Sequence, residues 1–198
     1  AGNIVRGYPM RHTLFAASIK DIGWITELCA KRRKGDAELV AKVNKLIDRP
    51  LSRAELKERA ATTLPEVPFW HVVRVAMESG HAVYSGVEQL ITPVELPGLD
   101  EAFNGDQVAA TADLMVRYFR THGPATLRDF AWWTKLPQRL IRPAADSLPP
   151  DIERCGEESQ DFVSKVVMDM AEARRKRSVL LLGAFDEYIL GYRDRSFA

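Results

Sequence analysis

Residues 106–145, DQVAATADLMVRYFRTHGPATLRDFAWWTKLPQRLIRPAA, decide the fold, because they join a long amphipathic helix to a second helix start. The first helix is predicted from an apolar stripe at helical spacing, which consists of Val108, Ala112, Met115 and Phe119. Gly123 follows where a left-handed C-cap belongs, and Arg120 stands near the negative end of the helix dipole. Thr126 can cap the second helix, with Asp129 three residues later as its reciprocal partner.

The same signal stands earlier in the chain, at residues 50–56, PLSRAEL. Ser52 can cap a helix and Glu55 can reach back to it, while Leu51 precedes them as a hydrophobic staple. A helical pattern precedes each signal, and a short helix, a proline-marked turn, a third helix and a strand pair follow each one. The strand pairs are predicted at residues 81–96 and 151–168. This is the order of a winged helix, so the sequence predicts an α+β, mostly helical chain of tandem winged-helix (helix-turn-helix) modules with small β-wings.

The repeated pattern divides the chain into four segments. Residues 1–35 hold a strand pair and a helix, which we interpret as the remnant of an upstream module. Residues 36–100 are predicted to form the first winged helix and residues 105–170 the second, with a linker at 97–105. Residues 171–198 are predicted to hold a helix end and the C-terminal strands of a following, truncated module. We therefore expect the chain to be part of a longer protein.

Composition excludes several classes of protein. Hydrophobic residues make up 46% of the chain and charged residues 28%, which is typical of a globular protein with a sizeable core. No apolar run reaches the length of about 18 residues that a membrane span needs. Cys29 and Cys155 are isolated thiols without the paired spacing of a metal site, which is typical of a reducing compartment. The sequence predicts a cytoplasmic protein with no metal, no cofactor and no contact with a membrane.

Positive charge is concentrated in the second module, although the net charge of the chain is only +1. Residues 114–145 carry six basic side chains against Asp129 alone, a balance of +5. Residues 50–80 of the first module carry four basic and four acidic side chains, a balance of zero. Because clustered cations neutralise phosphates, we predict that the second module binds duplex DNA and that the first is a scaffold or a dimer surface.

The candidate DNA-binding residues are Arg120, Arg128, Lys135, Gln138, Arg139 and Arg142. Gln138, Arg139 and Arg142 stand near the start of the predicted recognition helix, where Arg can bond guanine and Gln can bond adenine. The alternative is that they are solvated surface residues. Pro143 disfavours a continuous helix here, so the helix is either kinked or begins at Arg142.

Two further groups have both a structural and a functional interpretation. Trp132 and Trp133 could stack on an extruded base, but neighbours on a helix point about 100° apart, so we expect one in the core and one partly exposed. The basic run at residues 174–177 can contact phosphates or lie solvated at a helix end.

Asp186 and Glu187 are the candidate catalytic residues, because two carboxylates between apolar runs lie at the edge of a core. They can pair with Arg193 and Arg195. Alternatively, they can orient a water molecule.

Three stretches resemble a known family: LLLGAFDEYILGYRDRS at 180–196, IVRGYPMRHTLFAAS at 4–18 and THGPATLRDFAWWTKLP at 121–137. They are similar to the winged-helix DNA-binding-domain proteins that include bacterial interstrand-crosslink-repair DNA glycosylases. The resemblance implies tandem winged helices that cradle duplex DNA. It also implies that active members cleave the glycosidic bond of alkylated purines with a Gln-x-Gln or Gln-x-Asp motif, which belongs to a winged helix upstream of the strand segment.

The chain departs from the family pattern at two places. Its glutamines, which are Gln89, Gln107, Gln138 and Gln160, do not reproduce the spacing of that motif. In addition, Arg11–Phe15 reads RHTLF where the family usually has Arg-Gly-Thr-Leu-His, so Phe15 replaces the histidine. Neither set of catalytic groups can therefore be assigned to this chain.

Three hypotheses about function follow from the sequence. The first is a DNA-binding fragment of a glycosylase-like repair protein that acts on alkylated or crosslinked bases. The alternative is a non-enzymatic winged-helix transcription regulator, which would be a homodimer on half-sites about 34–36 Å apart. The third is a winged helix that binds proteins, for which Arg139→Glu would leave DNA affinity unchanged.

Overall fold

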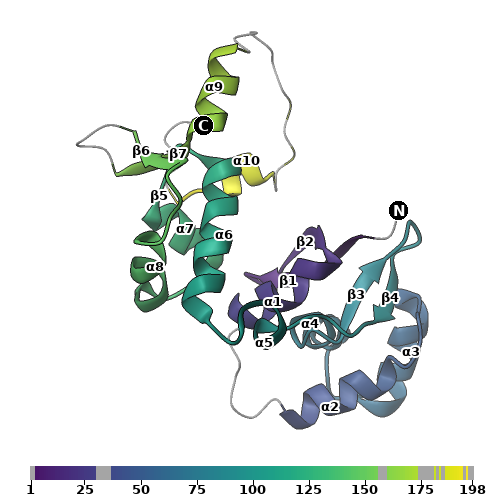
Figure 1. Ribbon diagram of the computed structural model, residues 1–198. Coiled ribbons are helices and arrows are strands. Elements are labelled where there is room, and N and C mark those ends of the chain that lie inside the picture. The colour runs from purple at the N-terminus through teal and green to yellow at the C-terminus, as the bar shows by residue number, and fades with distance from the viewer. Residues whose placement is uncertain are drawn as a thin grey trace. The chain divides into compact units, whose positions relative to one another are not determined.

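The chain has a mixed α/β fold in which helices are combined with small antiparallel sheets (Figure 1). A computed structural model describes residues 3–29, 37–155, 160–173, 186–193 and the single residues 181, 183 and 195. The chain divides into two compact units, residues 1–106 and residues 107–198. None of the described helices is long and apolar enough to cross a membrane.

The first unit contains a four-stranded antiparallel sheet with the strand order β2-β1-β3-β4. Its strands are β1 (Ile4–Met10), β2 (Thr13–Ser18), β3 (Ala82–Ser85) and β4 (Leu90–Pro93). The strand pairs predicted near residues 4–17 and 81–96 are confirmed, and Arg6 of β1 pairs with Tyr84 of β3. Residues 4–18 thus share a sheet with the later hairpin, which differs from the predicted boundary at residue 35.

Helices cover this sheet and enclose the core of the first unit. They are α1 (Ile19–Cys29), α2 (Ala37–Leu46), α3 (Arg53–Thr63), α4 (Phe69–Glu78) and α5 (Leu99–Phe103). The core lies between α2, α3, α4 and the β3–β4 hairpin, and its fully buried side chains include Val43, Leu51, Leu56, Val72 and Ile91. Helix α5 lies in the predicted linker, but the backbone N–H of Leu99 donates to Glu27 Oε2 at 2.9 Å, so this segment is tied to α1.

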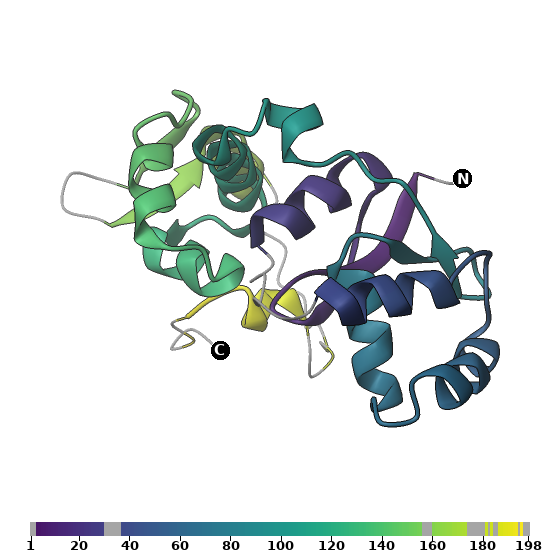
Figure 2. The ribbon, with the colours of Figure 1, turned by 90° about the horizontal axis from the view of Figure 1, so that it is seen from below.

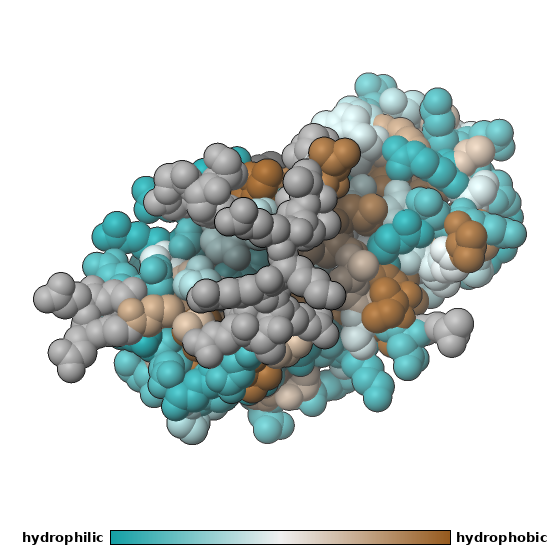
Figure 3. Space-filling view, turned by 90° about the horizontal axis from the view of Figure 1, so that it is seen from above, coloured by the Kyte–Doolittle hydropathy of each residue, from teal (hydrophilic) through white to brown (hydrophobic). Residues whose placement is uncertain are grey.

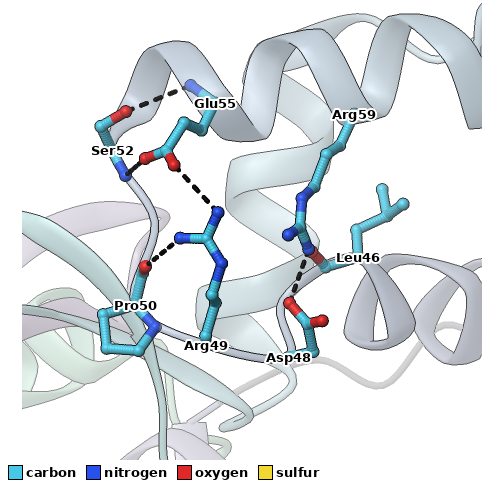
Figure 4. A network of polar contacts seen from close by, with 7 residues as sticks. All are labelled: Leu46, Asp48, Arg49, Pro50, Ser52, Glu55 and Arg59. Carbon is cyan, nitrogen blue, oxygen red and sulfur yellow. Dashed lines mark hydrogen bonds and ion pairs between the residues drawn. The ribbon is translucent and has the colours of Figure 1, made fainter.

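The start of α3 follows the predicted capping box (Figure 4). The backbone N–H of Glu55 donates to Ser52 Oγ at 3.2 Å, and the backbone N–H of Ser52 donates to Glu55 Oε2 at 2.8 Å. Arg49 Nη2 donates to the other carboxylate oxygen of Glu55 at 3.0 Å. These bonds satisfy N–H groups that a helix start leaves without partners, which is why the helix begins at Arg53.

The second unit combines helices with a three-stranded sheet of order β5-β7-β6. Its elements are α6 (Gln107–His122), β5 (Ala125–Thr126), α7 (Leu127–Thr134), α8 (Gln138–Ala145), β6 (Ile152–Arg154), β7 (Asp161–Ser164), α9 (Lys165–Ala173) and α10 (Glu187–Leu190). Figure 2, which views α6 nearly along its axis, shows α7 and α8 beside it. The predicted stripe on α6 supplies Met115 and Phe119 to the core, where both are fully buried.

The prediction for Gly123 is wrong, and one of the two alternatives at Pro143 is excluded. Gly123 has no left-handed backbone; it joins Pro124 through a cis peptide bond, and a Cβ added to it would lie 2.7 Å from the Phe119 carbonyl oxygen. Glycine is therefore required here by a close approach. Helix α8 begins at Gln138 and not at Arg142, with Pro143 inside it. Pro143 lacks a backbone N–H and so removes one hydrogen bond from α8. It lies near the end of this eight-residue helix, where few turns follow it.

The strand predicted to continue to residue 168 ends at Ser164, and α9 begins at Lys165. Ser164 pairs with Ile152, the first residue of β6, and the preceding Pro150 cannot donate a hydrogen bond that would extend the ladder. The C-terminal strand pair is also wrong where the structure describes it, because Glu187–Leu190 is helical. The basic run at 174–177 lies outside the described residues.

Exposed apolar side chains are present in both units. Those with large side chains include Trp70, Val87, Trp132, Val166, Met168, Met170 and Tyr188. On the face shown in Figure 3, hydrophobic residues stand as separate patches among hydrophilic ones. Single apolar residues are normal on a protein surface, whereas Val166, Met168 and Met170 lie on one helix, α9.

Glu55 makes the stability of the first unit depend on pH. Its bonds to the Ser52 backbone and hydroxyl, and then to Arg49, lower the pKa of Glu55 from 4.5 to about 2. A carboxyl whose pKa is lower in the folded chain stabilises the fold above its ordinary pKa, and this stabilisation is lost as the pH falls from 4.5 towards 2. The free energies of unfolding of the wild type and of Glu55→Gln in urea should therefore differ most at pH 7, differ less at pH 3, and converge only at about pH 2. Glu66→Gln removes an exposed carboxylate that caps no helix, and it should show no such convergence.

Candidate nucleic-acid interface

The turn into α7 is built around the buried carboxylate of Asp129, which is 6% exposed. Its Oδ2 accepts hydrogen bonds from the Thr126 backbone N–H at 2.9 Å and from the Thr126 hydroxyl at 2.6 Å. The backbone N–H of Asp129 donates to Thr126 Oγ1 at 3.1 Å, which completes the predicted capping box. The carboxylate of Asp129 is thus turned inward, while the neighbouring basic side chains of Arg128 and Lys135 remain at the surface.

The other oxygen of Asp129 holds the C-terminal segment. Asp129 Oδ1 accepts a hydrogen bond from the backbone N–H of Arg193 at 2.8 Å. The Tyr118 hydroxyl donates to the carbonyl of Gly191 at 2.9 Å, and the Tyr192 hydroxyl donates to the carbonyl of His122 at 2.6 Å. Burial raises the pKa of Tyr192, so its hydroxyl stays protonated and remains a donor. Residues 191–193 are therefore fixed on α6 and α7 and belong to the second unit.

A cluster of aromatic side chains from α6 and α7 supports residues 191–193. The Tyr118 ring lies 4.7 Å from the His122 ring, 5.1 Å from Trp133 and 5.5 Å from Phe130, measured between ring centroids. Trp133 Nε1 donates to Glu187 Oε2 at 3.0 Å. Aromatic pairs in this distance range contribute about 0.5–1.5 kcal/mol each beyond their buried area. His122 is thus a packing residue.

These contacts produce a hollow of about 270 Å³ on the surface of the second unit. It is lined by Arg128, Ala131, Trp132, Lys135, Gln138 and Arg193. Three of the predicted DNA-binding residues therefore come together at the end of α7 and the start of α8. Arg193 adds a fourth basic or polar head group, and it was predicted only as a partner of the nearby carboxylates.

Lys135 is held in place by its backbone and by Trp132. It ends α7 in the left-handed conformation, with φ 62°, and its Nζ lies 3.2 Å from the centroid of the Trp132 ring. Arg195 lies over the same ring, with Cζ at 6.0 Å from the centroid. Trp132 is 37% exposed and Trp133 is 9% exposed, which confirms that one indole lies in the core and one at the surface. Cations already contact the exposed indole, so it is less suited to stacking on a base.

Helix α8 presents the remaining candidates to solvent. Leu140, Ile141 and Ala144 are buried on its inner face. Arg139 and Arg142 are exposed on the other side, beyond Gln138. Among the described residues, no carboxylate forms an ion pair with Arg139 or Arg142. A short helix therefore carries its polar side chains on one side, next to the hollow.

Arg120 is placed differently from the other five predicted residues. Its guanidinium makes a two-pronged contact with Asp151, with N···O distances of 2.9 to 3.1 Å. Arg117, counted in the same basic stretch, pairs with Asp113 at 2.7 Å. A guanidinium that already faces a carboxylate has less to gain from a phosphate. Arg120 is also not among the residues that line the hollow.

The two candidate catalytic carboxylates have structural partners. Asp186 caps α10 by accepting a hydrogen bond from the backbone N–H of Tyr188 at 2.9 Å. Glu187 accepts the bond from Trp133. These contacts differ from the predicted pairing with Arg193 and Arg195. Among the described residues, no group of three or more His, Cys, Asp or Glu side chains could hold a metal ion.

The sequence matches the family described as DNA glycosylase AlkZ-like over residues 1–198. The chain belongs to this family. Its resemblance to DNA glycosylases is thereby confirmed. No curated protein sequence matches the chain significantly.

A solved structure of the DNA glycosylase AlkZ from Streptomyces sahachiroi has a similar fold. It superposes with a TM-score of 0.66 at 18% sequence identity, and the match covers 96% of this AlkZ-like chain and 60% of that chain. At this identity the likeness concerns the fold. The AlkZ-like chain therefore spans 60% of the length of that glycosylase.

Asp129→Ala should destabilise the second unit strongly. It leaves the backbone N–H groups of Thr126 and Arg193 without their acceptor, and an unsatisfied buried polar group costs about 1–3 kcal/mol. We expect the free energy of unfolding to fall by about 3 kcal/mol in a urea titration. The matched control is Asp146→Ala, which removes an exposed carboxylate at the end of α8 and should cost less than about 0.5 kcal/mol. Equal losses in the two variants would contradict a central role for Asp129.

Proposed function

We propose that each unit is a winged helix and that the second one binds duplex DNA in a glycosylase-like repair protein. The order α6, α7, α8 and the β6–β7 hairpin supports a winged helix in the second unit, and α2, α3, α4 and the β3–β4 hairpin support one in the first. In this arrangement α8 takes the position of the recognition helix. The family of DNA glycosylase AlkZ-like proteins supports DNA as the partner.

The observation that carries the proposal is the convergence of basic side chains beside α8. Arg128, Lys135 and Arg193 line one hollow, where they can neutralise backbone phosphates. Lys135 is held over Trp132 before any ligand binds, so little side-chain freedom is lost on binding. Gln138 and Arg139 at the start of α8 are suited to contact base edges.

We leave Arg120 out of this interface and add Arg193. Arg120 would have to exchange the Asp151 carboxylate for a phosphate, whereas Arg193 lies beside Lys135 in the hollow. Arg142 follows Arg139 by three residues on α8, so it extends the same surface along the helix. The first unit has no such excess of cations in residues 50–80, which supports a scaffolding role for it.

The whole protein is proposed to be an enzyme that excises a damaged base. The AlkZ-like family supports hydrolysis of a glycosidic bond, and the sequence resemblance suggests alkylated or crosslinked bases as substrates. Asp186 and Glu187 are used as a helix cap and as a hydrogen-bond partner of Trp133, so we propose structural roles for both. None of the glutamines of this chain has the spacing of the motif that the resemblance implies, so we propose no catalytic residue among them.

Charge reversal beside α8 should weaken DNA binding. Arg139→Glu and Lys135→Glu are each expected to raise the Kd for a duplex at least about tenfold, because each replaces an attraction to the polyanion by a repulsion. Fluorescence anisotropy with a labelled duplex gives the Kd. Lys135→Ala should also lower the slope of log Kd against log salt by about one, as expected for one lost phosphate contact.

Two controls make this test specific. Lys57→Glu reverses the same charge on an exposed position of α3 and should leave the Kd within about twofold. Arg120→Ala should have a similarly small effect because Asp151 already neutralises that guanidinium. If Arg139→Glu binds DNA as tightly as the wild type, the surface serves a protein partner and the DNA interface is refuted.

A glycosylase assay tests the enzymatic part. The longer protein that contains the upstream motif should convert alkylated duplex DNA into abasic product. The 198-residue chain should bind the same duplex without forming that product. Intact binding without abasic product from the longer protein would remove the enzyme hypothesis. A sharp palindromic preference in a selection from random duplexes, together with a dimer in solution, would favour the transcription regulator.

A further inference from the structure

A cavity of about 650 Å³ lies within the first unit, and none of its lining residues belongs to the second unit. It is lined by α1, α2, α4, the β1–β2 turn and the segment at residues 96–98. This volume falls within the range of about 300–1,000 Å³ that is usual for small-molecule sites. The proposed DNA contacts do not use any of its lining residues.

One wall of the cavity carries a connected row of polar side chains. Glu78 forms a short contact with His12 Nδ1. On its other side, Glu78 Oε2 lies 3.8 Å from Arg74 Nε. Arg74 Nη2 lies 3.2 Å from His71 Nε2. These four side chains come from the β1–β2 turn and from α4, so two distant segments jointly hold this row in place.

The remaining lining alternates polar and apolar groups. Ser79 Oγ donates to Asn44 Oδ1 at 3.4 Å, which orients the Asn44 amide. The apolar lining consists of Ala37, Val40, Ala41, Val75 and Leu96, with Gly23, Gly80 and Gly98 beside them. A site with apolar surfaces and hydrogen-bonding groups of both kinds suits a flat heterocycle that has donors and acceptors around its edge.

Two glycines allow residues 96–98 to lie close to α1 at one side of the cavity. A Cβ added to Gly23 would lie 2.4 Å from the carbonyl oxygen of Pro97, and one added to Gly98 would lie 2.7 Å from Glu27 Oε2. A side chain at Gly23 would push this segment away from α1 because it would meet the backbone of Pro97, and one at Gly98 would displace the Glu27 carboxylate. The sequence therefore permits a close approach that keeps this side of the cavity closed.

The charged side chains that line the cavity disfavour a ligand that carries phosphate. Among the lining residues that the structure describes, the charged side chains are Arg74, Glu27 and Glu78, a formal balance of −1 when His12 and His71 are not counted. A phosphate would be repelled by this balance, whereas an uncharged or cationic heterocycle would not. A base that is still part of a DNA strand would bring phosphates with it, so a free molecule fits better.

We propose that this cavity binds a free nucleobase or nucleoside without phosphate. The choice of nucleobases among flat heterocycles rests on the proposed function, because a DNA glycosylase releases a free base. The cavity itself is argued from the first unit alone. Binding of a nucleobase and binding of DNA can therefore succeed or fail independently.

The test uses ligand-observed NMR and titration calorimetry on the full chain. The probes are adenine, guanine, adenosine, guanosine and cytidine, together with adenosine and guanosine 5′-monophosphate. We expect at least one base or nucleoside to bind, and its monophosphate to bind at least about tenfold more weakly. The absence of binding by every base and nucleoside refutes the proposal, and so does equal binding of a nucleoside and its monophosphate.

Variants locate the site. Ala41→Trp adds an indole to an exposed position of the cavity lining, and it should weaken binding at least about tenfold. The control Ala54→Trp adds the same group to an exposed position of α3 outside the cavity, and it should leave binding unchanged. If Ala41→Trp unfolds the unit, Asn44→Leu removes the amide from the lining instead and should give the same loss. Unchanged nucleoside binding in the folded variant refutes the proposal, while the DNA affinity of the same sample reports separately on the second unit.

Discussion

The buried carboxylate of Asp129 is the constraint on which the second unit depends. One of its oxygens closes the capping box with Thr126 and so fixes where α7 begins. The other accepts the backbone N–H of Arg193, from a segment 64 residues later in the chain. Because one side chain sets both positions, the start of α7 and the C-terminal segment cannot shift independently. The two contacts thus position the segments that supply Arg128 and Arg193 to the lining of the hollow.

The aromatic cluster extends this constraint across the unit. Tyr118 touches His122, Phe130 and Trp133, and its hydroxyl reaches Gly191. Burying a hydroxyl or an indole N–H without a hydrogen-bond partner is costly in free energy. The Tyr118 hydroxyl is therefore directed at a carbonyl, and the Trp133 indole N–H at a carboxylate. Trp133 and Glu187 satisfy each other in this way. The same contacts that stabilise the core therefore place Arg193 at the surface.

Local signals were readable from the sequence, whereas long-range ones were not. Both capping boxes, the hairpins and the inward turn of one of the two tryptophans follow from spacings of a few residues, and the structure confirms them. The pairing of β1 with β3 joins segments more than 70 residues apart, and no local pattern encodes it. Gly123 misled the prediction because a glycine serves a close approach as well as a left-handed turn. Arg193 was missed because the charge count covered only residues 114–145. The basic stretch RDRS at residues 193–196 was the signal that could have indicated it.

The pairing of each arginine says more about this surface than the number of arginines. The balance of +5 over residues 114–145 includes Arg117 and Arg120, which face Asp113 and Asp151 in the folded chain. Their charges are compensated locally and produce little field at a distance, because opposite charges a few ångströms apart act as a dipole. The field near α8 is therefore set by Arg139 and Arg142, with which no described carboxylate forms an ion pair, together with Arg193. A chain with a net charge of only +1 can in this way present a strongly basic surface over a small area.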